Sequence, residues 1–133
     1  MNRKYLLAYA ATAAVMLALD ALWLGLVATP LYQQGIGHLM AAAPRLGVAA
    51  LFYAVYPVGL VVFAVLPATD RRNAVLKGAL FGFFAYATYD LTNLATLKQW
   101  PVWLAGLDMA WGALVSAVSA VAGKAAVDSV GRS

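Results

Sequence analysis

The sequence predicts an all-α membrane protein, a four-helix transmembrane bundle that forms a single domain over residues 1–133. Hydrophobic residues make up 65% of the chain and charged residues only 11%, whereas a soluble domain carries about 25% charged residues. The chain also contains four apolar runs, each long enough for the roughly 20-residue helix that crosses a bilayer. These runs nearly fill the chain, so no separate soluble domain is expected.

Each predicted span has a recognisable boundary. The basic residues Arg3 and Lys4 precede the first run, Pro67 closes the second, and Pro101 stands where a proline can open the fourth helix. The expected spans are residues 5–28, 46–66, 74–97 and 102–126.

The connection between the first two spans is long and semi-apolar. It runs from Pro30 to Pro44 and includes Tyr32, Gln33 and His38. Because it is longer than a usual helix–helix connection, we expect a short interfacial or re-entrant segment over the outer mouth of the bundle.

The distribution of basic residues predicts the orientation. Cytoplasmic segments of membrane proteins retain an excess of Lys and Arg. With an inside N-terminus, seven of the nine basic residues are cytoplasmic and two are external. The seven are Arg3, Lys4, Arg71, Arg72, Lys77, Lys124 and Arg132, and the two are Arg45 and Lys98. We therefore expect a multi-pass protein with both termini in the cytoplasm.

Three acidic residues lie within the predicted spans, at Asp20, Asp90 and Asp108. An intramembrane carboxylate is costly and normally faces a bundle interior or a cavity. At a rise of about 1.5 Å per residue, each lies roughly 10–13 Å from the outer end of its span. The three acids therefore share one layer in the outer half of the membrane, and this predicts a common site.

Aromatic and amide side chains accompany these acids. Tyr86 and Asn93 share a helix face with Asp90, Tyr53 reaches the same depth on the second span, and the first and fourth spans each contain Asp-x-x-Trp. The two tryptophans are expected to bracket a pocket from opposite sides. The predicted ligand-binding residues are Asp20, Trp23, Tyr53, Tyr86, Asp90, Asn93, Asp108 and Trp111.

Other polar and small residues have simpler interpretations. Lys98 is a candidate counter-charge for the acids, although its side chain could instead extend to the outer interface. Trp100, Trp103 and the remaining tyrosines fit an interfacial aromatic belt. Gly78 and Gly82 allow close helix approach. Each acid could also serve only to hold helices together.

Several kinds of chemistry lack the residues that they need. The chain has no cysteine and one histidine, His38, so no metal site is expected. It contains no Gly-rich phosphate loop and no serine with a paired histidine motif, and no cofactor is predicted. The net charge of +4 reflects basic residues at span ends, so no nucleic-acid partner is expected. Whether the protein is an enzyme stays open.

A long stretch of the chain resembles a known family. It reads Tyr86-Ala-Thr-Tyr-Asp-Leu-Thr-Asn-Leu-Ala-Thr-Leu-Lys-Gln-Trp-Pro101, with Gly78-Ala-Leu-Phe-Gly82 before it and Asp108-Met-Ala-Trp-Gly112 after it. With Asp20-Ala-Leu-Trp-Leu-Gly25 and Leu51-Phe-Tyr-Ala-Val-Tyr-Pro57, it resembles the bacterial membrane family filed as domain of unknown function 2177. The resemblance implies a compact four-span protein of the bacterial inner membrane and names no reaction.

The leading functional hypothesis is an outward-facing acidic and aromatic pocket that binds a small cationic or amphiphilic ligand, since carboxylates attract the charge and aromatic faces add cation–π contact. A second hypothesis is a proton-coupled transporter, loosely similar to the four-span small multidrug transporters. A third is a small lipid-modifying enzyme in which Asp90 and Asp108 act as acid and base. A fourth is an assembly subunit without a ligand. The sequence leaves open whether the chain forms a homo-oligomer.

Overall fold

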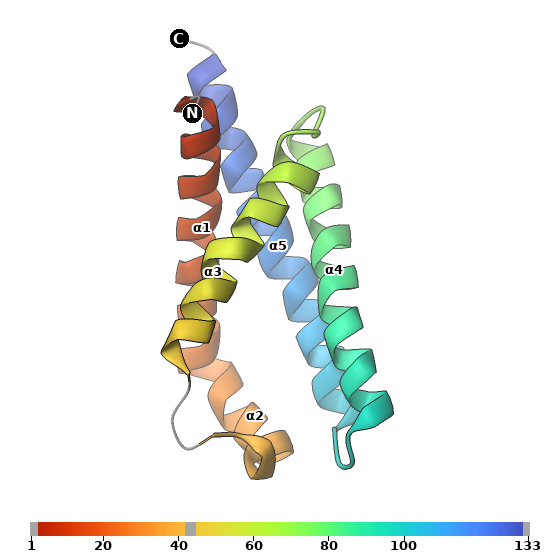
Figure 1. Cartoon of the computed structure of the whole chain (residues 1–133). Coiled ribbons are helices and arrows are strands. Elements are labelled where there is room, and N and C mark those ends of the chain that lie inside the picture. The colour runs from red at the N-terminus through yellow and green to blue at the C-terminus, as the bar shows by residue number, and fades with distance from the viewer. Residues whose placement is uncertain (1–2, 42–44, 132–133) are drawn as a thin grey trace.

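The computed structural model describes residues 3–41 and 45–131, and these residues are almost entirely helical, with no strand among them (Figure 1). Residues 42–44 of the long connection and Arg132 of the charge count lie outside the described residues. Three short segments, η1 to η3, have π or 3₁₀ geometry. The elements are α1 (Arg3–Trp23), η1 (Leu24–Ala28), α2 (Thr29–Ile36), η2 (Gly37–Leu39), α3 (Leu46–Leu60), η3 (Val61–Val65), α4 (Arg71–Thr96) and α5 (Val102–Gly131).

Three helical segments of the described chain are long and apolar enough to cross a membrane: Arg3–Leu39, Leu46–Val65 and Val102–Val130. The all-α class and the apolar membrane helices predicted from the sequence are therefore confirmed. The remaining long helix, α4, has 26 residues but is less apolar, so a fourth span stays a prediction.

Three threonine hydroxyls of α4 are satisfied within the helix itself. The hydroxyls of Thr88, Thr92 and Thr96 each donate to the carbonyl four residues earlier, at 2.6–2.8 Å. All three side chains are exposed on the surface of the isolated chain. Because each hydroxyl is satisfied by its own helix, it needs neither water nor a neighbouring helix.

The connection after the first predicted span begins as a continuation of that helix. The π-helical turn η1 joins α1 to α2, and Pro30 lies in the first turn of α2. A π-helical turn and a proline are both common causes of a helix bend, and α2 bends away from the line of α1 (Figure 1). As a result, α2 contacts α5 at the end of the molecule away from the two termini.

Glycines allow α4 and α5 to pack closely. A Cβ atom on Gly78 would lie 2.7 Å from the Ser116 carbonyl oxygen, and one on Gly82 would overlap Gly112 and Ser116. The small residues that the sequence suggested for close helix approach therefore lie at such a contact. This α4–α5 seam fixes the position of α4 relative to α5.

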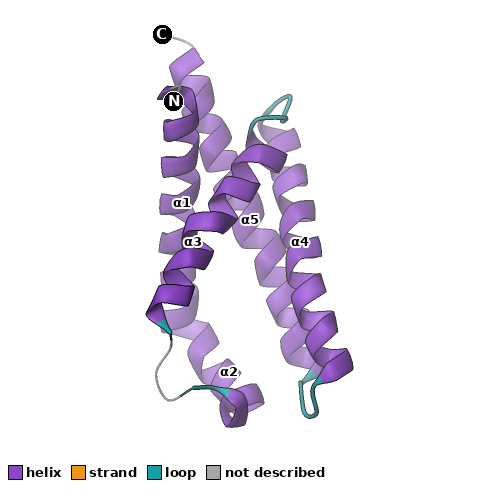
Figure 2. Ribbon diagram, viewed as in Figure 1, coloured by secondary structure: helices purple, strands orange, loops and turns teal. Residues whose placement is uncertain are grey.

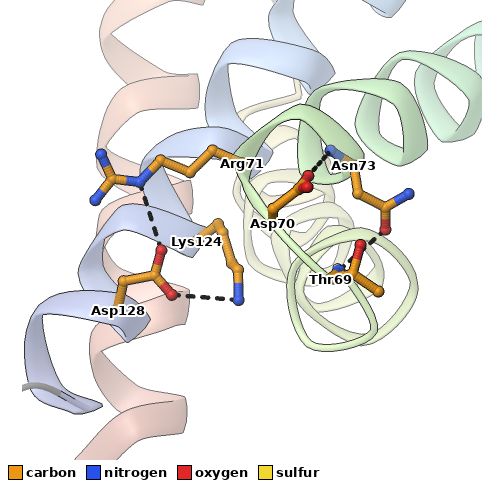
Figure 3. Close-up of polar contacts among 6 residues, drawn as sticks. All are labelled: Thr69, Asp70, Arg71, Asn73, Lys124 and Asp128. Atoms are coloured by element: carbon orange, nitrogen blue, oxygen red, sulfur yellow. Dashed lines mark hydrogen bonds and ion pairs between the residues drawn. The ribbon is translucent and has the colours of Figure 1, made fainter.

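The end of the molecule that carries both termini is closed. A core of mostly small apolar side chains fills it between α1, η3 and α5, comprising Ala8, Leu60, Val61, Ala64, Val65, Ala120 and Val127. In the turn before α4, the backbone N–H of Asn73 donates to Asp70 Oδ1 at 2.7 Å, so the Asp70 side chain caps the helix (Figure 3). From this end, α3 and α4 diverge toward the opposite end of the molecule (Figure 2).

Of two ion pairs at the same end, the one from Arg71 links α4 to α5, and the one from Lys124 lies within α5. Arg71 Nε lies 3.4 Å from Asp128 Oδ2, and Lys124 Nζ lies 3.2 Å from Asp128 Oδ1 (Figure 3). The Arg71 side chain is 54% exposed, so its pair adds little stability. Asp128 therefore has positive partners of its own, unlike the acids at the opposite end.

Candidate functional site

Asp20 joins three helices. Its side chain on α1 is buried, Tyr53 Oη of α3 donates to Oδ2 at 2.7 Å, and Trp111 Nε1 of α5 donates to Oδ1 at 2.9 Å. Each carboxylate oxygen thus accepts a hydrogen bond from a different helix. This arrangement matches the structural role that the sequence analysis left open for each acid.

The two tryptophans of the repeated Asp-x-x-Trp pattern lie against each other. The rings of Trp23 and Trp111 stack with centroids 4.4 Å apart and planes 6° apart. The two rings therefore do not face each other across a pocket as expected, but both line the cavity of about 150 Å³ beside Asp20. Because α1 and α5 run in opposite directions and pack together, the two indoles meet between the helices.

Asp108 binds a residue that the sequence analysis did not include in the site. Tyr32 Oη of α2 donates to Asp108 Oδ1 at 2.7 Å. Tyr32 lies in the long connection, and its role depends on the bend at η1, which no sequence periodicity indicated. The side chain of Asp108 lines three separate cavities, so it is the residue that they share.

Asp90 has the least usual environment of the three acids. It is fully buried, at 0% exposure, and neither carboxylate oxygen meets hydrogen-bond geometry with any residue that the structure describes, although Asp108 and Trp100 lie near enough to interact with it. It lines a cavity of about 170 Å³ together with Tyr32, Asp108 and Trp100. Buried polar groups in proteins nearly always have a partner, so this carboxyl group requires an explanation.

Trp100 belongs to this cavity and not only to an interfacial belt. Its buried Nε1 atom meets hydrogen-bond geometry with no described residue, but the Asp90 carboxyl group lies near enough to interact with this N–H donor. The turn at residues 97–101 brings the ring beside Tyr89 at a centroid distance of 5.8 Å. A tryptophan near a span end is typical of an interfacial belt, so the sequence position of Trp100 did not indicate this role.

The remaining predicted site residues lie in different surroundings. Tyr86 lines two of the Asp108 cavities and contacts the edge of Tyr56 at 6.1 Å. Asn93 is half-buried on α4, one turn after Tyr89. Lys98 is exposed in the turn after α4 and makes no ion pair with a described residue. The expected counter-charge for the acids is therefore not supplied by Lys98 in this structure.

Two further cavities adjoin Asp108. One of about 150 Å³ lies around Asp20, Trp111 and Tyr53. The other, of about 380 Å³, lies between α3 and α4. We call the second the α3–α4 groove, and its lining residues are Phe52, Tyr56, Ala85, Tyr86, Tyr89 and Asp108. Phe52, Tyr56 and Tyr89 were not predicted as site residues, although the spacing of Phe52 and Tyr56 by four residues places them on one helix face.

Comparison with known proteins identifies the family. Residues 5–125 match the model of a family described as predicted membrane protein (DUF2177). The chain belongs to this family. The resemblance carried by the third-span motif is thereby confirmed, and the protein is a membrane protein of a family without an assigned function. No curated protein and no solved structure matches the chain.

Within this DUF2177 protein, Asp90 and Asp108 form the acidic part of the candidate site. They line one cavity and interact electrostatically. The cavity wall supplies two phenols, from Tyr32 and Tyr89, and one indole, from Trp100, and the described wall residues include no cation. An acidic pair with aromatic walls accepts hydrogen bonds and attracts positive charge.

Proposed function

We propose that this membrane protein binds a small organic cation at Asp90 and Asp108. The observation that carries the proposal is the Asp90 carboxyl group, which is fully buried, has no hydrogen-bond partner among the described residues, and faces a cavity. A bound cation would pair with the charge of this group. Asp108 supplies a second carboxyl group on the wall of the same cavity.

The chemistry of the cavity favours a cation over an anion or a neutral ligand. Because an unpaired buried charge is costly, two adjoining carboxyl groups in apolar surroundings are neutralised by a proton or by a bound cation, and an anion is excluded. Tyr89 and Trp100 add ring faces and edges to the wall, and aromatic faces stabilise ammonium groups. The volume of about 170 Å³ equals the space of several water molecules, at about 30 Å³ each, and suits a compact ammonium head.

The proposed function also assigns an orientation. We propose a four-span bundle in the bacterial inner membrane with both termini in the cytoplasm and the acidic cavity in the outer half. The seven-to-two distribution of basic residues supports this. Both termini and the turn before α4 lie at one end of the molecule, while α2 and the turn after α4 lie at the other (Figure 1).

Labelling of introduced cysteines tests the orientation. In this cysteine-free chain, an impermeant thiol reagent applied to intact cells should label Gly35→Cys and spare Arg72→Cys. Permeabilised cells provide the control, since both variants should then react. Labelling of Arg72→Cys but not Gly35→Cys in intact cells would refute the proposed orientation.

Binding of tetramethylammonium to the purified protein in nanodiscs tests the ligand site. Asp90→Asn should lower the affinity at least about tenfold, the equivalent of about 1.4 kcal/mol, because the amide keeps the volume but removes the charge. Asp128→Asn is the matched control, since Asp128 pairs with Arg71 and Lys124 at the other end, and it should bind as the wild type does.

Thermal unfolding of the same samples shows whether the variants remain folded. A folded Asp90→Asn protein with undiminished tetramethylammonium binding would remove Asp90 from the site. Absence of binding to the wild type would contradict the proposed function as a whole.

A further inference from the structure

The α3–α4 groove adjoins the acidic cavity, and the two share Tyr89 and Asp108 in their walls. α3 packs against α1, while α4 packs against α5 and, near its start, against η3. The two consecutive helices approach each other toward one end, where Phe81 of α4 contacts Gly59 of α3, and the rings of Tyr56 and Tyr86 meet farther along. Toward the opposite end they diverge (Figures 1 and 2), and the groove of about 380 Å³ lies between them.

The rim of this groove is aromatic and exposed. Phe52 on α3 is 41% exposed and Tyr89 on α4 is 56% exposed. Both lie on helices at the depth of the predicted acid layer, so in a bilayer these exposed rings face acyl chains and not water. The mouth of the groove therefore opens sideways into the membrane.

The inner part of the groove reaches the acids. Tyr89 and Asp108 line both the groove and the cavity that contains Asp90. A molecule with its head beside Asp90 and Asp108 would extend past Tyr89 into the groove. The head would meet carboxyl groups, and the remainder would meet Phe52, Ala85 and other apolar or aromatic surfaces.

We propose that the ligand is a single-chain cationic amphiphile that enters from the bilayer between α3 and α4. This inference rests on the proposed function and specifies its ligand class. The compact ammonium head lies at the Asp90–Asp108 pair, and the alkyl chain lies in the α3–α4 groove. The head is positively charged because it lies beside two carboxyl groups. The alkyl chain is expected because the groove is apolar and opens toward the lipid.

Two alkylammonium probes separate the inference from the proposed function. Tetramethylammonium contains only the head, whereas octyltrimethylammonium adds a chain. Both are titrated calorimetrically into nanodiscs, and titrations of empty nanodiscs are subtracted to remove partitioning into lipid. The wild type should bind the long-chain probe about tenfold more tightly, because the chain packs in the groove.

Ala85→Phe adds volume to the groove and not to the cavity around Asp90, since Ala85 lines only the groove. It should abolish the preference for the chain and leave tetramethylammonium affinity unchanged. Leu80→Phe is the matched control on the same helix, where the side chain is exposed, and it should keep the preference. Phe52→Ala, which removes a wall and adds no volume, should weaken the preference and provides a second variant.

The results distinguish failure of the lateral groove from failure of the cation site. If the wild type binds both probes equally, or if Ala85→Phe and Phe52→Ala both retain the preference, the lateral groove does not hold the chain and the inference is wrong, while the cation site stands. If neither probe binds, the proposed function fails and the inference fails with it.

Discussion

Asp20 and Asp90 are the same residue type at the same predicted depth, yet their surroundings differ completely. Asp20 receives one hydrogen bond on each oxygen, from Tyr53 and Trp111. Asp90 is buried more deeply and receives none from the described residues. The difference shows that burial of a carboxyl group in a membrane helix does not by itself indicate function. The set of partners distinguishes an acid that holds helices together from one that is available to a ligand.

The two environments depend on different packing. Asp20 lies where α1, α3 and α5 meet, and the stacked rings of Trp23 and Trp111 close that junction. Asp90 lies on α4, whose position is fixed by the glycine seam with α5. The seam is tight enough to hold Asp90 near Asp108, while the diverging α3 leaves the other side of α4 open.

Breaking the seam should therefore remove the Asp90 environment entirely. Gly82→Leu would force a side chain into the Gly112 and Ser116 backbone and side chain, and we expect it to lower the free energy of unfolding by about 3 kcal/mol or more, at the upper end of overpacking effects. Reversible unfolding in mixed micelles measures this loss.

The control for this variant is Gly106→Leu. A Cβ atom at Gly106 on α5 meets nothing within 4 Å, so Gly106→Leu should leave the free energy of unfolding unchanged or raise it by up to about 1 kcal/mol, since glycine is a poor helix former. Equal losses for both variants would show that the α4–α5 contact is not the close seam described above.

How far the sequence predicted this arrangement depends on the kind of interaction. The helices and the depth of the acids follow from apolar run lengths and from the rise of a helix, both of which are local properties. The bond from Tyr53 to Asp20 joins residues 33 positions apart, so only their common depth was predictable. The bond from Tyr32 to Asp108 depends on the bend at η1, and no pattern in the sequence marks a π-helical turn. Packing of α3 on α1, which leaves the groove open, is likewise decided by tertiary contacts.

Substitution of Asp20 tests its role as a structural residue. Asp20→Leu leaves Tyr53 Oη and Trp111 Nε1 without their acceptor, and we expect a loss of about 2–3 kcal/mol in the free energy of unfolding. Asp20→Asn should cost less than about 1 kcal/mol, because the amide oxygen accepts from Trp111 and the amide nitrogen donates to Tyr53.

Double-variant cycles with Tyr53→Phe show whether this loss comes from the hydrogen bond to Asp20. The two changes should be non-additive, since they remove the same bond. Equal destabilisation by Asp20→Asn and Asp20→Leu would mean that the charge, and not the pair of hydrogen bonds, stabilises the junction.

Substitution of Asp90 by leucine should raise the free energy of unfolding, whereas the same substitution of Asp20 should lower it. Asp90→Leu removes a buried carboxyl group that makes no hydrogen bond to the described residues, and the adjoining cavity of about 170 Å³ leaves room for the larger side chain. Without ligand, we expect the free energy of unfolding to rise by about 1–2 kcal/mol, because the desolvation cost of an unsatisfied polar group is relieved. The same variant should fail to bind tetramethylammonium, so stability and binding would change in opposite directions, as expected where a site is maintained at the expense of stability.

Unfolding of wild type, Asp90→Leu and Asp20→Leu under one set of conditions provides the comparison. A loss of more than about 1 kcal/mol in Asp90→Leu would mean that Asp90 stabilises the helices as Asp20 does, and the distinction between the two acids would then be wrong.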